Sequence, residues 1–167
     1  MRKPLLGIVA VAMLALAGCG PQESRYVIEI RQPPAKVWPW VTEPDKLEQW
    51  IGGVKEIKPL TDDKVLRVGA REQMILEMPE GRYVMESEVL AFETARMIRV
   101  KAVVPDGFDQ IIEYTLDDTG GATRLTFSSQ TTLKHWVANL LLPLWWPDAE
   151  KKLNSDLARL KALAEAS

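Results

Sequence analysis

Cysteine and histidine are almost absent from this chain, which has one of each among its 167 residues, Cys19 and His135. A single cysteine cannot form a disulfide within the chain, a thiolate zinc cluster or a Cys-x-x-Cys redox pair. A lone histidine also argues against the usual structural metal sites. No serine and carboxylate pattern near His135 completes a catalytic triad, and a solvated histidine is ordinary at the start of a helix.

An excess of positive charge is also missing, because 21 Lys and Arg residues face 23 Asp and Glu residues, for a formal net charge of −2. Nucleic-acid-binding proteins normally carry a broad basic surface, so the sequence predicts no nucleic-acid partner. The motifs P-loop, G-x-G-x-x-G, H-E-x-x-H and G-x-S-x-G do not occur. We therefore expect no metal and no other cofactor.

Only one long hydrophobic run is present, from Leu5 to Ala17, and it follows the positively charged Arg2 and Lys3. Thirteen helical residues would span about 20 Å, whereas the hydrocarbon core of a bilayer is about 30 Å thick. The run is therefore too short for a membrane span. It is typical of the apolar region of a secretory signal peptide.

The end of this segment, Leu16-Ala17-Gly18-Cys19, resembles the lipobox of bacterial lipoproteins. The resemblance implies a signal peptide over 1–18, a lipidated Cys19 with a polar tether over 19–24, and a domain over 25–167. It also implies anchoring in the cell envelope, on the periplasmic face of the outer membrane, because Gly20 replaces the aspartate linked to inner-membrane retention. The alternative is an ordinary cleaved signal followed by a stray cysteine.

The remaining chain has the composition of one globular domain, with 47% hydrophobic and 26% charged residues overall. The β-branched stretch Tyr26–Ile30 predicts a strand, and prolines at the first turns predict short helices over Ala35–Val41 and Pro44–Ile51. Turn residues then separate short segments, which favours an antiparallel meander. The predicted strands are Val54–Leu60, Lys64–Val68, Arg71–Met78, Arg82–Phe92, Arg96–Val104, Phe108–Leu116 and Ala122–Thr131. Leucines at helical spacing predict a C-terminal helix.

Alternation within the strands predicts which face meets solvent. Glu86, Glu88, Arg99 and Lys101 should lie on the outer face, because burying unpaired charges costs several kcal/mol each. The residues of opposite parity should then point toward the covering helix. They are Met74, Leu76, Met78, Tyr83, Met85, Ser87, Ile98, Val100, Gln110, Ile112, Tyr114, Leu125, Phe127 and Ser129.

Several segments, in this order, resemble the START-like (SRPBCC) superfamily, in its branch called polyketide cyclase/dehydrase and lipid-transport-like. They are Pro34-Ala35-Lys36-Val37-Trp38, residues 42–50, Gly53-Val54-Lys55-Glu56, Val68-Gly69, Tyr114-Thr115-Leu116 and residues 121–125. The resemblance covers about residues 25–165. It implies an α+β helix-grip fold, in which a curved antiparallel sheet of six to seven strands wraps around a long C-terminal helix, with two short helices after the first strand.

The sequence departs from this pattern at three prolines. Pro39 should kink or shorten the first short helix, because proline removes a backbone hydrogen bond. Pro143 and Pro147 should interrupt the start of the final helix and leave the apolar segment Leu140–Trp146 mobile. This segment could serve as a lid over the cavity, as part of the core or as a membrane contact.

The helix-grip resemblance implies an apolar cavity between the sheet and the C-terminal helix, where a few polar groups would orient a ligand. The alternative for these polar groups is that they are buried and bonded to the backbone. Trp38 and Trp50 should pack in the core instead. The predicted ligand-binding residues are Met74, Leu76, Tyr83, Met85, Ser87, Val100, Gln110, Ile112, Tyr114, Phe127, Ser129, Trp136, Leu140, Leu144 and Trp145.

These observations predict a monomeric, membrane-anchored lipoprotein that binds a small or medium hydrophobic molecule, such as a lipid or an aromatic compound. No acid/base pair is visible, which favours a binding protein over an enzyme. A cyclase or hydratase remains an alternative, with Tyr83, Tyr114, Gln110 or Glu72 polarising a carbonyl group. A protein-interaction module with a filled core is the third hypothesis.

Overall fold

A computed structural model describes residues 21–167 apart from 62–64 and 79–80, and in residues 136–146 it describes the backbone only. The predicted signal peptide and Cys19 lie outside the described residues. The elements, in order, are β1 (Gln22–Ile30), α2 (Pro34–Val37), the 3-10 helix η1 (Trp38–Val41), α3 (Pro44–Trp50), β2 (Val54–Pro59), β3 (Arg71–Met78), β4 (Gly81–Glu93), β5 (Met97–Val104), β6 (Phe108–Asp118), β7 (Thr123–Leu133) and α4 (Trp136–Glu165).

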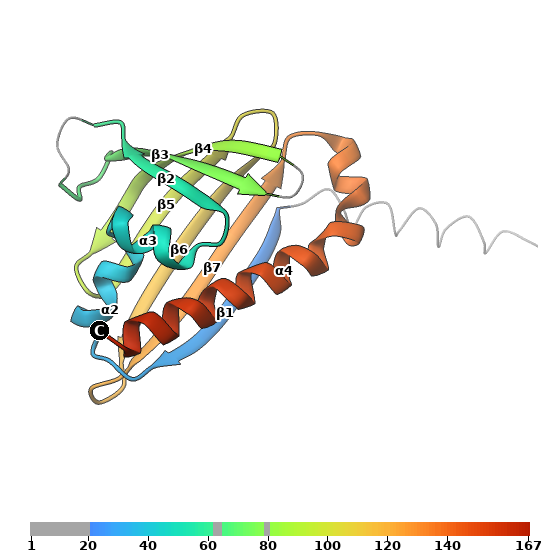
Figure 1. The fold of residues 1–167 in the computed structure, drawn as a ribbon. Helices are drawn as coiled ribbons and strands as arrows, with labels where there is room; N and C mark the ends of the chain where they lie inside the picture. The colour runs from blue at the N-terminus through green and yellow to red at the C-terminus, as the bar shows by residue number, and fades with distance from the viewer. Residues whose placement is uncertain (1–20, 62–64, 79–80) are drawn as a thin grey trace, which may run out of the picture.

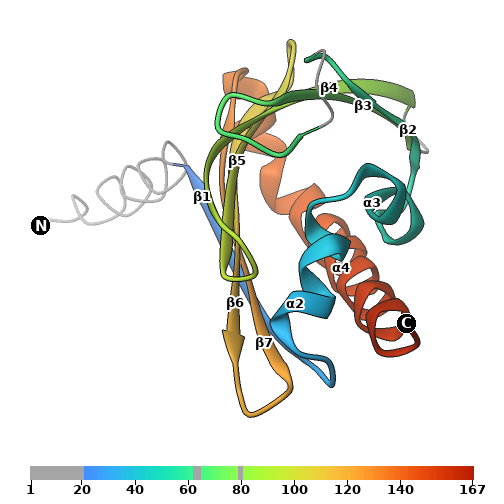
Figure 2. The same cartoon turned by 90° about the vertical axis from the view of Figure 1, so that its left-hand side faces the viewer.

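The strands form one antiparallel seven-stranded sheet in the order β1-β7-β6-β5-β4-β3-β2. Figure 1 shows the sheet curving over the short helices and α4, and Figure 2 shows the same arrangement from the side. The predicted helix-grip architecture is therefore confirmed. Antiparallel pairing of chain neighbours follows from the short turns, and only β1 pairs with a distant strand, β7.

Two predictions about the strands were wrong. Residues 22–24, assigned to a tether from their polar composition, begin β1, where Gln22 pairs with Thr131 and Ser24 with Ser129. Residues 65–68 form no strand. They lead instead into a turn at Gly69, whose φ of +80° favours glycine. Amino-acid composition gave the wrong prediction in both cases. Whether a segment becomes a strand depends on the strand edge available for pairing as well as on the β-propensity of its residues.

The prolines shape the helices as local geometry requires. Pro34 and Pro44 occupy first-turn positions of α2 and α3, where the missing N–H is no loss. At Pro39, α2 gives way to the 3-10 turn η1, as predicted. The interruption predicted in the last helix does not occur, because α4 is one helix of 30 residues. Its first turns, orange in Figure 1, instead lie at an angle to the long remainder.

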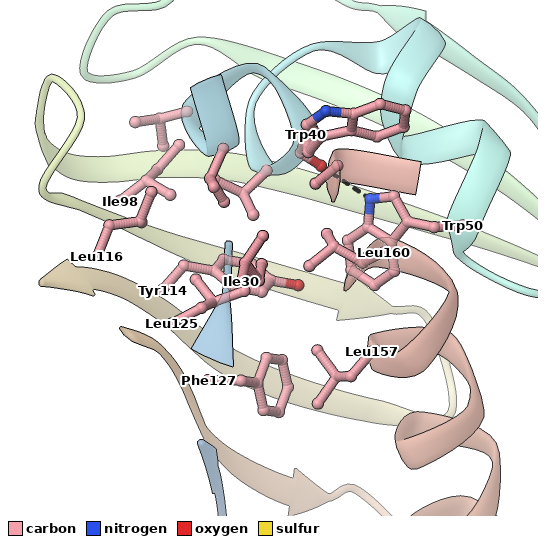
Figure 3. Close-up of a cluster of buried hydrophobic side chains, with 14 residues drawn as sticks. Ile30, Trp40, Trp50, Ile98, Tyr114, Leu116, Leu125, Phe127, Leu157 and Leu160 are labelled. Atoms are coloured by element: carbon pink, nitrogen blue, oxygen red, sulfur yellow. Dashed lines mark hydrogen bonds between the residues drawn. The ribbon is translucent and has the colours of Figure 1, made fainter. Parts of the chain in front are cut away.

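The core lies where α3 and α4 meet the inner face of the sheet (Figure 3). Trp50 is 2% exposed, and its Nε1 donates a hydrogen bond of 2.8 Å to the backbone carbonyl of Trp40. The ring of Trp50 meets that of Tyr114 edge to face at 6.4 Å, and Tyr114 meets Phe127 at 5.4 Å. Trp50 is thus a core residue, as predicted, and Trp38 packs against the same cluster.

Polar contacts fix the position of α4 against the rest of the fold. Asp156 is buried, accepts a hydrogen bond of 3.0 Å from the backbone N–H of Gly52, and forms an ion pair with Lys152. Near the C-terminus, Glu165 accepts hydrogen bonds from the backbone and side chain of Arg31. These contacts tie the second half of α4 to α3 and to the end of β1.

Candidate functional site

Cross-strand register divides the inner face of the sheet into rows, because directly paired residues point to the same side. One row runs through Ile98, Tyr114 and Phe127, and the next through Val89, Val100, Ile112 and Ser129. A third row runs through Glu72, Ser87, Ala102, Gln110 and Thr131. The predicted inner-face parity is therefore correct along these strands.

The rows differ in how well the helices cover them. Ile98, Tyr114, Leu116, Leu125 and Phe127 are all buried, so this part of the inner face is closed. The chain packs α4 against α3, β1 and β7, and thus over one side of the sheet. Toward the start of α4, six inner-face side chains remain half-buried, among buried neighbours such as Ala102, Ser129 and Thr131. The six half-buried side chains are Leu76, Met85, Ser87, Val100, Gln110 and Ile112.

We call these six side chains the open half of the inner face. Val100, Ile112 and Met85 supply apolar surface, while Ser87 and Gln110 supply hydrogen-bonding groups. The side-chain amide of Gln110 donates a hydrogen bond of 2.9 Å to the hydroxyl of Thr131. That bond holds the amide in one orientation and leaves its carbonyl oxygen as an acceptor. Partly exposed apolar surface beside a few oriented polar groups is typical of a small-molecule site.

Glu72 lies in the same row as Ser87 and Gln110, and burial raises the pKa of its carboxyl. Burial disfavours the charged form of a carboxyl group, so Glu72 keeps its proton to a higher pH than a solvated glutamate does. Glu72 has the same strand parity as Met74, which predicts an inward carboxyl group. The structure confirms that placement.

Because the pKa of Glu72 is raised in the folded state, its ionised form costs stability at neutral pH. The variant Glu72→Gln should therefore melt at a higher temperature than the unchanged protein at pH 7. This gain should shrink as the pH falls and vanish below about pH 4, where the glutamate is protonated in both the folded and the unfolded chain. Glu88→Gln, on the exposed outer face, is the control and should show no such gain. A gain for Glu72→Gln that persists at low pH would contradict this account.

Other predicted site residues do not belong to the open half. Tyr114 and Phe127 belong to the closed core, where burial and the nearby Asp156 raise the pKa of the Tyr114 hydroxyl. Met74 and Ser129 are buried beside the open half, and Tyr83 is 40% exposed near the β3–β4 hairpin. The side chains of Trp136, Leu140, Leu144 and Trp145 lie outside the described residues.

Sequence reasoning missed two inner-face residues that border the site. Thr131 anchors the Gln110 amide, and it was overlooked because it closes a predicted strand. Tyr26 sits on β1 opposite Phe127, and its hydroxyl donates a hydrogen bond to Glu150 of α4. The sequence signal for Tyr26 was that it alternates with Ile28 on the first strand, which places both side chains on the same face of the sheet.

The outer face carries charge, as predicted. Arg71 and Glu86 form an ion pair of 2.7 Å, and Arg99 approaches Glu113 at 4.0 Å. Two solvent-open hollows lie on this side of the sheet, one of about 150 Å³ around the Arg71–Glu86 pair and one of about 270 Å³ beside Arg25 and Ser128. Most of the residues that line the two hollows are charged or polar.

The described residues form neither a metal-ligand cluster nor a membrane-spanning helix. In the part of the chain that the structure describes, no three His, Cys, Asp or Glu side chains gather as metal ligands. No helix in that part is long and apolar enough to cross a membrane.

Comparison with known proteins agrees with this architecture. No curated protein matches the chain in sequence. An aromatase/cyclase from Streptomyces sp. R1128 has a similar structure, with a TM-score of 0.71 and 12% identity over 87% of this chain and 94% of that one. A conserved protein from Geobacillus kaustophilus has a TM-score of 0.71 and 16% identity, covering 87% and 97% of the two chains. Ara h 8.0201 has a TM-score of 0.70 and 12% identity, covering 89% and 100%.

The family model for polyketide cyclase/dehydrase and lipid transport matches residues 21–165. That span includes every strand, the short helices and all of α4. The structural likenesses, at these low identities, support the fold alone. The match over most of the chain confirms the START-like resemblance, and the protein belongs to the polyketide cyclase/dehydrase and lipid transport family.

Proposed function

We propose that this protein binds a small or medium hydrophobic molecule at the open half of the inner face. The observation that carries the proposal is the incomplete burial of Val100, Ile112 and Met85 beside a closed part of the same face. Covering apolar surface contributes about 25 cal/mol per Å², so a ligand of lipid or aromatic character would gain most from this site.

The third row of the inner face, which contains Ser87 and Gln110, adds a polar requirement for the ligand. Gln110, held by Thr131, presents an amide acceptor, Ser87 presents a hydroxyl, and Glu72 lies one strand further along the row. Polar groups in a partly desolvated site cost free energy when they are left unpaired. A ligand with an apolar body and one hydrogen-bonding group therefore fits better than a pure hydrocarbon.

Catalysis is the second candidate, and one observation favours it. Burial raises the pKa of Glu72, so its carboxyl keeps its proton to a higher pH than a solvated glutamate does and could act as a proton donor. A cyclase or dehydrase could use it to protonate a carbonyl oxygen. Conversion of a bound carbonyl compound by the unchanged protein, with binding but no conversion by Glu72→Gln, would establish this role.

The N-terminal segment adds a location to the proposed activity. Cys19 would be acylated after removal of residues 1–18, which anchors the domain to the envelope without a spanning helix. By its sequence context, the anchor would lie on the periplasmic face of the outer membrane. The domain would then work as a monomer beside a lipid surface.

Mass spectrometry of the protein extracted gently from membranes tests both parts of the proposal. An acylated N-terminal peptide beginning at Cys19 is the expected result for the anchor. A stoichiometric apolar molecule that stays bound in the native spectrum is the expected result for the site. An unmodified N-terminus would overturn the anchor alone. A protein that contains no ligand and does not bind the neutral apolar probe N-phenyl-1-naphthylamine would overturn the ligand site.

A further inference from the structure

Four parts of the fold meet at one end of the sheet. Gln22, at the start of β1, pairs with Thr131 near the end of β7, and α4 begins five residues after Thr131. Phe108, next to the β5–β6 turn, pairs with Leu133 at the same end. The β3–β4 hairpin extends in the same direction, beyond the Glu72–Ser87 pair. Figure 1 shows that β1 starts at the end of the sheet where α4 begins.

We call this the anchor end, because Cys19 precedes Gln22 by only three residues. A chain covers at most about 3.5 Å per residue, so an acylated Cys19 would keep the start of β1 within roughly 10 Å of the lipid surface. Because the tether is so short, the end of the domain where β1 starts should face the bilayer.

The anchor end carries exposed apolar side chains, next to the exposed charged residues Glu77, Arg82, Asp106 and Lys134. Tyr83 is 40% exposed and Val84 38% exposed at the start of β4, next to the β3–β4 hairpin. Residues 136–147, where α4 begins, read WVANLLLPLWWP and contain no charged residue. Tyrosine and tryptophan are the side chains that membrane interfaces favour, because their rings are apolar and their tips are polar.

We propose that the anchor end docks on the phospholipid bilayer, with the open half of the inner face turned toward it. This inference rests on the proposed acylation of Cys19. The row of Ser87 and Gln110 adjoins the last inner-face row at this end, which contains Phe108 and Leu133. The ligand would then be a lipid-soluble molecule that passes between the bilayer and the site without crossing water.

Fluorescent labels on the full acylated protein test this orientation. Acylation blocks Cys19, so Tyr83→Cys and Thr119→Cys each introduce the single reactive thiol. Thr119 lies in the exposed β6–β7 turn, at the far end of the sheet. Vesicles of phosphatidylethanolamine and phosphatidylglycerol would carry a nitroxide on the acyl chain, which quenches only labels that reach the bilayer interior.

We expect quenching at position 83 to exceed that at position 119 by at least about threefold, because docking places the start of β4 at the boundary between headgroups and acyl chains. Val65→Cys adds a label at a competing apolar site, the exposed loop before β3, where Val65 is 65% exposed. Equal quenching at positions 83 and 119, or stronger quenching at 65, in protein of acylated mass would overturn the orientation while leaving the anchor intact. Unacylated mass would overturn the anchor and the orientation together, and the N-phenyl-1-naphthylamine titration reports on the ligand site in either case.

Discussion

Replacing Ile112 with glutamine should lower the affinity for N-phenyl-1-naphthylamine at least about tenfold, which corresponds to 1.4 kcal/mol. Ile112 lies in the middle of the open half, between Val100 on β5 and Ser129 on β7. The glutamine amide would have to lose its water against an apolar ligand without gaining a partner, and this costs more than the lost methyl contacts alone. Fluorescence titration measures the change directly.

The neighbouring residue provides a matched control. Ile111 is also a half-buried isoleucine of β6, but it pairs with Lys101 and Gln130 on the outer face. Ile111→Gln should therefore bind the probe within about twofold of the unchanged protein, as a surface substitution away from the site. Equal losses for the two variants, or no loss for Ile112→Gln, would show that the probe binds elsewhere.

The second large effect concerns stability. Leu160→Ala should reduce the free energy of unfolding by about 3 kcal/mol, because it leaves a cavity in the core beneath α4. Leu160 is fully buried in the cluster that contains Trp50 and Tyr114. Urea unfolding followed by tryptophan fluorescence reports the difference, since Trp40 and Trp50 lie in the same cluster.

Leu90→Ala is the corresponding control on β4, where Leu90 is 37% exposed at the bulge between Val89 and Ala91. This variant makes the same chemical change without leaving a cavity in the core, so the free energy of unfolding should fall by less than about 1 kcal/mol. A cost for Leu90→Ala as large as that for Leu160→Ala would contradict the assignment of the core. Should Leu160→Ala fail to fold, Leu160→Met keeps the volume and should cost under about 1.5 kcal/mol.

The architecture was largely predictable from local patterns. Alternation of Met85 and Ser87 with Glu86 and Glu88 predicted the correct faces of β4, because burying an unpaired charged side chain is unfavourable. Prolines at the first turns located α2 and α3, and turn residues located the hairpins. These signals are local, and the family resemblance supplied the way they assemble.

The site was predictable only in part, since coverage of the inner face depends on where the helices lie. Tyr114 and Ile112 have the same parity on β6, but Tyr114 packs against Trp50 while Ile112 remains half-buried. The spacing of residues in the sequence does not show which of the two side chains is covered by a helix. Asp156 likewise looks like a solvent-facing residue of an amphipathic helix, yet it is buried because it binds the backbone of Gly52.

The most direct test of the central claim is to map the probe onto the protein by amide chemical shifts. The chain from residue 19, with Cys19→Ser, would be labelled with ¹⁵N and titrated with N-phenyl-1-naphthylamine. The account predicts that the largest shifts fall at Ser87, Val100, Gln110 and Ile112. Shifts centred on the outer-face hollows at Arg71 or Arg25, or no saturable shifts anywhere, would contradict a ligand site on the inner face.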